Sequence, residues 1–480
     1  MSSAELSSRM VRCASTNMAT RRSISTCTFA VPLLVVLGGG CRDAGRSTGA
    51  GPVSVPTSVD AETPASSAKM AFIDDDYPRA LQQAKASGKP LFADTWAIWC
   101  HSCMSMKEFV LPAPEMQALA NTFVWLSIDS EKAENADFLE RFPTTSIPTL
   151  WVIDPVSERP LLKWVGAATA PELATLLDDA SRARTETTLG DAATAALHGD
   201  RAAAAGKSDE AVTAYREALA KGPLVWARRP RVIEALSLKL LDVERYAECV
   251  ELAATEMPRL PMGTPVANLA MNGLSAAASL PAGSPALQHV PLLLREATRI
   301  VEDKSESMLI DDRSGIFKAL VAALADRPAE AKRLARSWAK LLEGAAAMAR
   351  SPESRAVWDP HRLEAYIALG EVESAVTMLE QSERDFPDDY NPPFRLGRAY
   401  FELHRYEPAL LEVTRALQRA NGPRKLRILM LKADILESMK DRPGARRAIG
   451  EAVAFANQLR LPPSYRKLKD VLAKRYAALE

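Results

Sequence analysis

Between residues 70 and 185, short apolar runs alternate with segments whose apolar residues recur at helical spacing. The apolar runs predict four strands, at residues 90–97, 122–129, 147–154 and 161–167. The other segments predict four helices, at residues 77–89, 100–110, 135–142 and 170–183. Because helices that separate apolar strands cover both faces of a sheet, we expect an α/β domain with a mostly parallel sheet.

From residue 189 to residue 480 the strand pattern gives way to alanine- and leucine-rich helical patterns. Similar segments recur, each with a turn followed by a small residue near the start of a helix. The small residue is an alanine at five positions: Ala211, Ala247, Ala375, Ala409 and Ala445. Alanines of neighbouring segments lie 34 or 36 residues apart. This spacing resembles that of the tetratricopeptide repeat family, whose repeat unit is a pair of helices. The resemblance implies an all-α repeat solenoid, with a weaker pattern at residues 261–351, where prolines interrupt it.

The first 41 residues resemble a bacterial lipoprotein signal. Arg21 and Arg22 precede a short apolar run that ends in three glycines and Cys41. A basic segment, a short apolar segment and small residues before a cleavage point are typical of a secretory signal. The resemblance implies lipidation of Cys41 and anchoring on the periplasmic side of a bacterial membrane. Ordinary cleavage, which gives a soluble periplasmic protein, is the alternative. Residues 42–69 are rich in Gly, Ser, Pro, Thr and Ala and predict a disordered linker.

The composition excludes some classes of protein. Lys plus Arg equals Asp plus Glu, at 60 residues each, so the net charge gives no reason to expect a nucleic acid partner. Six cysteines are too few for a scaffold held together by disulfides. Two of them, Cys13 and Cys27, fall within the predicted signal. An exported chain would work in an oxidising compartment.

The stretch WAIWCHSCMSM, at residues 96–106, holds Cys100 and Cys103. The pair could be half of a zinc site, a structural disulfide or a redox-active dithiol. A zinc site needs two further ligands at suitable spacing, and the remaining candidates are scattered singly among the predicted helices. They are Cys249, His198, His289, His361 and His404. We expect these residues to pack or to face solvent, and we expect no metal and no cofactor.

The redox interpretation agrees with the local pattern. Cys100 follows a predicted buried strand and opens a predicted helix. Free backbone N–H groups and the positive end of the helix dipole favour a thiolate there. Cys103 lies one helical turn further on, close enough to form a disulfide with little backbone movement.

Three segments in this order resemble the thioredoxin family: FADTWAIWCHSC at residues 92–103, SIPTLWVID at 146–154 and WVGAATAPELATLL at 164–177. The longer segment after the cysteine pair resembles the thioredoxin-like domains of bacterial periplasmic reductases. The resemblance implies that residues 70–185 form a thioredoxin fold. It also implies that Cys100 is the attacking thiolate and Cys103 the resolving thiol.

The resemblance assigns roles to neighbouring residues as well. It implies that Pro148 is a cis-proline that aligns a substrate backbone, and that Asp94 is a buried proton acceptor for Cys103. Trp99 would pack next to the cysteine pair. In the family a lysine pairs with the buried aspartate, and we match its position to Trp125. We therefore expect Asp94 to lack a nearby cation and to have a raised pKa.

The two residues between the cysteines tune the redox potential in related folds. His101 could stabilise the Cys100 thiolate, which makes the protein more oxidising, or it could be a solvated side chain without effect. Ser102 occupies the second position.

Together these features predict an exported thiol–disulfide oxidoreductase, and they favour a reductase over an oxidase. Its partners would be protein thiol or disulfide clients and a membrane or periplasmic electron donor. The repeats would bind a client or partner through an extended segment, or act as a spacer. The alternative is a protein-binding repeat scaffold in which the thioredoxin-like domain is only a docking module.

Overall fold

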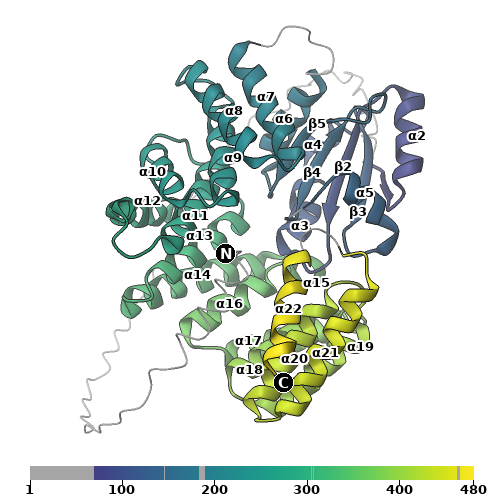
Figure 1. Ribbon diagram of the computed structural model, residues 1–480, viewed down its shortest axis with the longest axis vertical. Helices are drawn as coiled ribbons and strands as arrows, with labels where there is room; N and C mark the ends of the chain where they lie inside the picture. Colours follow the sequence, from purple (N-terminus) through teal and green to yellow (C-terminus); the bar gives the residue numbers. More distant parts are fainter. Residues whose placement is uncertain are drawn as a thin grey trace, which may run out of the picture. The chain divides into compact units, whose positions relative to one another are not determined.

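The computed structural model describes residues 70–144, 146–182, 190–303, 305, 307–461 and 465–479. The predicted signal and linker, with Cys41, lie outside these residues. Ala68–Glu480 form one compact unit, in which a five-stranded sheet is followed by an array of helices (Figure 1). The positions 185 and 189, where we placed the domain boundaries, also lie outside the described residues, so these boundaries stay predictions.

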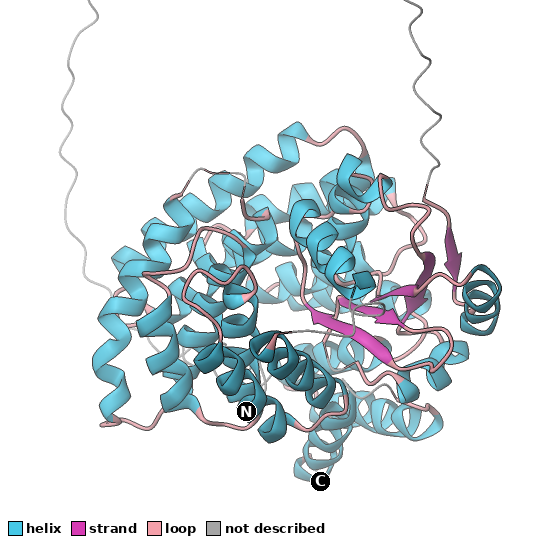
Figure 2. Ribbon diagram, turned by 90° about the horizontal axis from the view of Figure 1, so that it is seen from above, coloured by secondary structure: helices cyan, strands magenta, loops and turns pink. Residues whose placement is uncertain are grey.

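The sheet has the strand order β1-β3-β2-β4-β5 (Figure 2, strands in magenta). Its strands are β1 Phe72–Asp74, β2 Leu91–Trp96, β3 Val124–Asp129, β4 Thr149–Ile153 and β5 Pro160–Val165. The four predicted strands are confirmed, and β1 is an additional short strand. The expectation of a mostly parallel sheet is wrong, because β1, β3 and β2 pair in parallel whereas β2, β4 and β5 pair antiparallel. No helix separates β4 from β5, so a short turn joins them as a hairpin.

Strand alternation gives the sheet two apolar faces. Leu91 and Ala93 of β2 belong to a core that includes residues of α2 Tyr77–Ser87 and α5 Ala136–Arg141. Phe92 points to the other face. That face is covered by the helix after the cysteine pair (α3 His101–Ser105, continuing as the π-helical turn η1 Met106–Val110), by α4 Pro114–Gln117 and by α6 Ala170–Arg182. Asp94 lies two residues from Phe92 and shares its face. The thioredoxin-like segment therefore places Asp94 under the helix that begins at the cysteine pair.

From Asp191 onward the described chain is helical. The main helices are α7 Asp191–Ala204, α8 Ser208–Lys221, α9 Arg229–Asp242, α10 Tyr246–Glu256, α11 Thr264–Ser279, α12 Val290–Glu302, α13 Ile310–Ala323, α14 Pro328–Met348, α16 Asp359–Leu369, α17 Glu373–Asp385, α18 Asn391–Glu402, α19 Tyr406–Arg419, α20 Lys425–Ser438, α21 Arg442–Gln458 and α22 Arg466–Ala478. Shorter elements are η2 Ala133–Asn135, η3 Pro285–His289 and α15 Pro352–Ala356. Successive helices pack as pairs, as the repeat pattern predicts.

The recurring small residue is buried between paired helices. Ala211, Ala409 and Ala445 are each the fourth residue of their helix and are fully buried. In α10 the fourth residue is Cys249, which is also fully buried, whereas Ala247 is only partly buried. The small-residue position of this repeat is thus Cys249, and the assignment to Ala247 was two residues early.

The weaker pattern at residues 261–351 does not interrupt the array. Pro265 lies in the first turn of α11, and Pro285 begins the 3-10 turn η3. Proline is tolerated in the first turn, where its missing N–H would have no helical partner. Pro265 and Pro285 therefore mark where helices begin. No helix in the described part of the chain is long and apolar enough to cross a membrane.

Candidate functional site

The cysteine pair lies at the start of α3, as predicted. A disulfide joins Cys100 to Cys103, and their Cα atoms are 5.2 Å apart. Cys100 is the residue that caps the helix, and the backbone N–H of Cys103 donates to its sulfur over 3.2 Å. The Ser102 hydroxyl oxygen lies 3.6 Å from the same sulfur. These N–H and O–H groups can stabilise negative charge on Cys100 when the disulfide is reduced.

Pro148 immediately precedes β4. The Ile147–Pro148 peptide bond is cis, as the resemblance implied. The next residue, Thr149, pairs with Thr95 near the end of β2. The cysteine turn follows the end of β2, so Pro148 lies at the same edge of the sheet as the cysteine pair.

Asp94 lies in the centre of β2 and is 1% exposed. Neither of its carboxylate oxygens accepts a hydrogen bond from a described residue. Burial raises its pKa to about 6, and the charge of Lys107 partly opposes this rise. A carboxyl group with this pKa can accept and release a proton near neutral pH.

The expectation that Asp94 lacks a cation is wrong. Trp125 pairs with Phe92, so it lies two residues from the position opposite Asp94, which Ser127 occupies. Lys107 supplies the cation from the π-helical turn. Its ammonium donates to the Ser127 hydroxyl over 3.2 Å and lies 3.1 Å from the centre of the Trp96 ring.

Burial lowers the pKa of Lys107, and the nearby Asp94 opposes this shift. The sequence contained a signal for this lysine. Lys107 comes four residues after Cys103, which places both on one face of the helix that covers Asp94.

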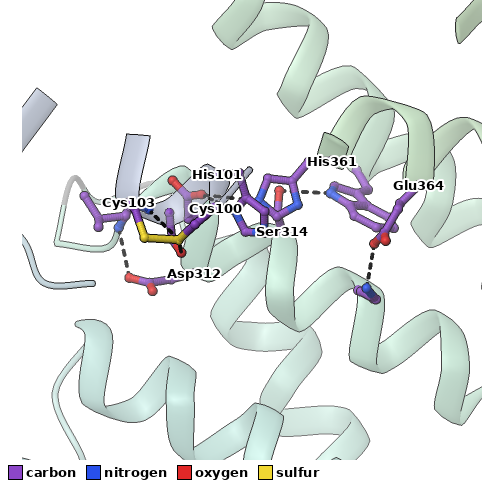
Figure 3. Close-up of polar contacts among 12 residues, drawn as sticks. Cys100, His101, Cys103, Asp312, Ser314, His361 and Glu364 are labelled. Atoms are coloured by element: carbon purple, nitrogen blue, oxygen red, sulfur yellow. Dashed lines mark hydrogen bonds and ion pairs between the residues drawn. A yellow bond between two sulfur atoms is a disulfide. The ribbon is translucent and has the colours of Figure 1, made fainter. Parts of the chain in front are cut away.

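His101 contacts the helical repeats. Its Nδ1 lies 2.9 Å from Oδ1 of Asp311, the second residue of α13. Nε2 of His361, on α16, lies 3.3 Å from the same oxygen, and the two imidazole ring centres are 3.9 Å apart (Figure 3). The prediction that His361 only packs or faces solvent is therefore wrong. Asp311 and His361 are more than 200 residues from His101 in the sequence, and no local pattern pointed to them.

This cluster perturbs its members. Burial disfavours the charged form of Asp311, but hydrogen bonds with His101 and His361 outweigh burial and hold the pKa of this carboxyl well below its usual range. Burial, followed by the neighbouring His101, lowers the pKa of His361. The adjacent Asp312 responds in the opposite direction, because burial and the charge of Asp311 raise its pKa to about 8.

Other contacts join the α/β domain to the first helix of several pairs. Arg231 of α9 donates to the Lys163 carbonyl of β5 over 3.3 Å. The Thr264 hydroxyl, at the start of α11, donates to the Glu172 carboxylate of α6 over 2.9 Å. The same Thr264 hydroxyl lies 3.0 Å from Asp312, the neighbour of Asp311, so this polar contact continues towards the residues that meet His101.

The last repeats contact the loop after β3 and the cysteine turn. The Tyr465 hydroxyl donates to Glu131 over 2.7 Å. The Arg424 guanidinium lies 4.6 Å from the centre of the Trp99 ring. Trp99 also packs against an apolar cluster of these repeats that includes Tyr390. Trp99 was expected to pack next to the cysteine pair, and the structure adds that it contacts the repeats.

The cysteine pair is largely covered. Cys100 is 4% exposed and Cys103 is fully buried. The Phe109 ring stacks on the Trp358 ring of the repeats at 5.5 Å and 7°. With His101 bound to Asp311, these contacts join the cysteine turn and the π-helical turn η1 to α13 and to the start of α16.

The remaining candidates behave as expected. Cys249 is a free, buried thiol, and burial raises its pKa to about 12, so it is an unreactive packing residue. His198 and His404 are exposed, and His289 is half-buried.

Residues 72–155 match the family model described as thioredoxin-like. The chain is similar to two curated proteins named thiol:disulfide interchange protein DsbD. The protein from Pseudoalteromonas atlantica is 35% identical over 83 residues, which are 17% of this chain and 14% of that protein. The protein from Cronobacter sakazakii is 34% identical over 111 residues, which are 22% of this chain and 19% of that protein. The chain thus spans less than a fifth of the length of these relatives.

Solved structures similar to this chain include tetratricopeptide repeat proteins. The match with a protein from Parabacteroides merdae covers 60% of this chain and 98% of that protein's chain, with 10% sequence identity and a TM-score of 0.39. The match with a protein from Thermus thermophilus covers 51% of this chain and 98% of that protein's chain, with 19% sequence identity and a TM-score of 0.25. The repeat architecture of this chain rests on its own helix pairs and their buried small residues.

Proposed function

We propose that this protein is a thiol–disulfide oxidoreductase that acts on protein cysteines. One observation carries the proposal: a CxxC pair caps a helix above a buried carboxyl group whose pKa is about 6, beside a cis-proline at the same edge of the sheet. The similarity of this segment to DsbD proteins supports the same chemistry.

In the reductive direction, the Cys100 thiolate attacks one sulfur of a client disulfide. A mixed disulfide forms, and the first client sulfur leaves as a thiolate that takes a proton from water. The Cys103 thiol then transfers its proton to Asp94 and attacks the Cys100 sulfur. The mixed disulfide breaks, the second client thiolate leaves, and two electrons have passed from the dithiol to the client.

We favour client reduction over client oxidation, because the long segment after the cysteine pair resembles that of the thioredoxin-like domains of bacterial periplasmic reductases. Each turnover leaves Cys100 and Cys103 oxidised, so a second thiol protein, at the membrane or in the periplasm, must return two electrons. Pro148 would align the client backbone, and Ser102 and His101 would set the stability of the Cys100 thiolate.

The repeats would control access to Cys100. Two contacts support this role: the stacking of Phe109 on Trp358 and the hydrogen bond between His101 and Asp311. A client that binds the same helices could replace the α/β domain there and expose the disulfide.

The second candidate function is a scaffold with a docking module. The contacts between the repeats and the α/β domain favour it, because such a module needs only a binding surface.

Reduction of insulin in the presence of dithiothreitol separates the two functions. The full-length protein should accelerate insulin reduction, and Cys100→Ser should abolish the acceleration. Cys249→Ala is the matched control, because it removes a buried thiol far from the site, and it should retain the activity. Equal rates of insulin reduction with wild-type protein and with Cys100→Ser would rule out the oxidoreductase function and leave the scaffold function.

We further propose export and lipid anchoring through Cys41, a residue of the signal-like N-terminal segment. Wild-type protein should fractionate with membranes, and Cys41→Ala should move it to the soluble periplasmic fraction. Wild-type protein wholly in the soluble fraction would argue for ordinary cleavage instead.

A further inference from the structure

Three metal-binding side chains meet where the cysteine turn contacts the repeats. His101 comes from the CxxC turn, Asp311 from α13 and His361 from α16. Nδ1 of His101, Nε2 of His361 and one Asp311 oxygen all lie within 4.8 Å of one another. Figure 3 shows the two imidazoles side by side, next to the cysteine pair. Three side chains from separate elements thus direct ligand atoms at one point.

The charge of Asp311 lacks the compensation that the partly buried Glu364 on α16 has. Its side chain is 4% exposed, and its only ion-pair partners among the described residues are the two imidazoles. Its second oxygen, Oδ2, has no hydrogen-bond partner among these residues. By contrast, Glu364 on α16 lies 2.7 Å from the Lys318 ammonium and 3.5 Å from the Arg398 guanidinium. A buried carboxylate with one open oxygen and no Lys or Arg partner is suited to a bound cation.

The two separations between the Asp311 oxygen and the histidine nitrogens are close to those around a small divalent ion, and the two nitrogens lie within 4.8 Å of each other. Zinc binds histidine nitrogen and carboxylate oxygen at about 2.0–2.2 Å, and tetrahedral geometry then separates the ligand atoms by about 3.3–3.4 Å. The Asp311 oxygen lies 2.9 Å from the His101 nitrogen and 3.3 Å from the His361 nitrogen. Side-chain shifts of a few tenths of an ångström would bring the first distance to the ideal. His101 is 36% exposed, so an ion could enter from solvent on its side.

We propose that His101, Asp311 and His361 bind one divalent metal ion of the zinc type, with a fourth position open to solvent. This proposal replaces our expectation that the chain has no metal site. Its ligands come from the CxxC turn and from two helices of the repeats, so the ion would hold the repeats against the catalytic turn. Removing the ion would loosen that contact, which connects metal content to access to Cys100.

The test uses the full-length oxidised protein, stripped of metal with a chelator that is then removed. Zn²⁺ titrated by calorimetry should bind with one tight site per chain. Co²⁺ should give the intense visible absorption of a four-coordinate site. His101→Ala should weaken Zn²⁺ binding by at least about 100-fold, since losing even an outer-shell partner of a metal ligand costs 10–100-fold. His101 is partly exposed, so this variant should fold normally.

Asp311→Asn and His361→Gln should have the same effect on Zn²⁺ binding. His404→Ala is the matched control, because His404 is an exposed histidine outside the cluster, and this variant should keep the tight site. No binding of Zn²⁺ or Co²⁺ to the wild-type protein, or equal binding to wild type and His101→Ala, would show that the three residues are only a hydrogen-bonded cluster. The measurement involves no turnover, so its failure would leave the proposed redox activity untouched.

Discussion

Replacing Lys107 with methionine should leave a smaller fraction of Asp94 ionised near pH 6. The substitution gives an unbranched apolar side chain that is one atom shorter and removes the positive charge that opposes the raised pKa of Asp94. A neighbouring opposite charge shifts a carboxyl pKa by about 1–3 units. We take the lower end, because Lys107 also interacts with Ser127 and with the Trp96 ring. The pKa of Asp94 should therefore rise from about 6 to about 7.

The consequence for turnover can be calculated from the fraction of Asp94 that is ionised. At pH 6 that fraction falls from about one half to about one tenth, so the step in which Cys103 attacks should slow about fivefold. At pH 8.5 Asp94 is ionised in both proteins, and the two rates should agree. The variant should thus shift the midpoint of the pH profile up by about one unit.

Stopped-flow measurement follows this step directly. Reduced protein is mixed with an aromatic disulfide whose thiolate is coloured, and the second release of thiolate reports the attack of Cys103 on the Cys100 mixed disulfide. Ser127→Ala is the matched control, because it removes a hydrogen bond of Lys107 and leaves its charge in place. Its pH profile should keep the wild-type midpoint. An unchanged midpoint for Lys107→Met, or a shift to lower pH, would refute the role of Asp94 as the base.

Three further predictions concern stability, reactivity and access. Because the pKa of Asp94 is raised in the folded protein, the wild type loses folding stability as the pH rises from about 4 to about 6. In urea melts, Asp94→Asn should therefore raise the free energy of unfolding at pH 7.5 by up to about 3 kcal/mol and leave it unchanged near pH 3.5. A variant that is less stable than the wild type at pH 7.5 would contradict this. In a thiol titration of the reduced native protein, Cys249 should stay unlabelled until denaturant is added, because it is buried and its pKa is about 12, and rapid labelling of Cys249 would be evidence against its burial. Phe109→Ala removes the stacking of Phe109 on Trp358, and such a pair is worth about 0.5–1.5 kcal/mol. Alkylation of reduced Cys100 should therefore be about 2- to 10-fold faster in this variant. An unchanged rate would show that this contact does not limit access to Cys100.

Much of the α/β domain could be predicted because its signals are local. An apolar strand, a CxxC pair, a helix and an Ile–Pro bond before another apolar strand follow one another at short range, and each element buries residues at its own period. The sheet was predicted with the wrong balance of parallel and antiparallel strands. That balance depends on the connection between β4 and β5, which is too short for a helix. The position opposite Asp94 was misassigned because strand register decides which residue lies there, and a shift of two residues replaces Trp125 with Ser127. The cation near Asp94 was missed because Lys107 comes from the helical turn and not from the neighbouring strand.

Local features of the chain were enough to predict a dithiol at a helix start, a buried carboxyl group beneath it, and paired helices with a small residue where they approach. These features depend on residues near one another in the chain or on a repeating period. The surroundings of the dithiol, in contrast, depend on how distant segments pack. His101, Asp311 and His361 are far apart in the sequence, and nothing in the local pattern of any of them favours the other two. They meet because the repeats pack against the α/β domain, and that contact depends on the combined geometry of many helix pairs.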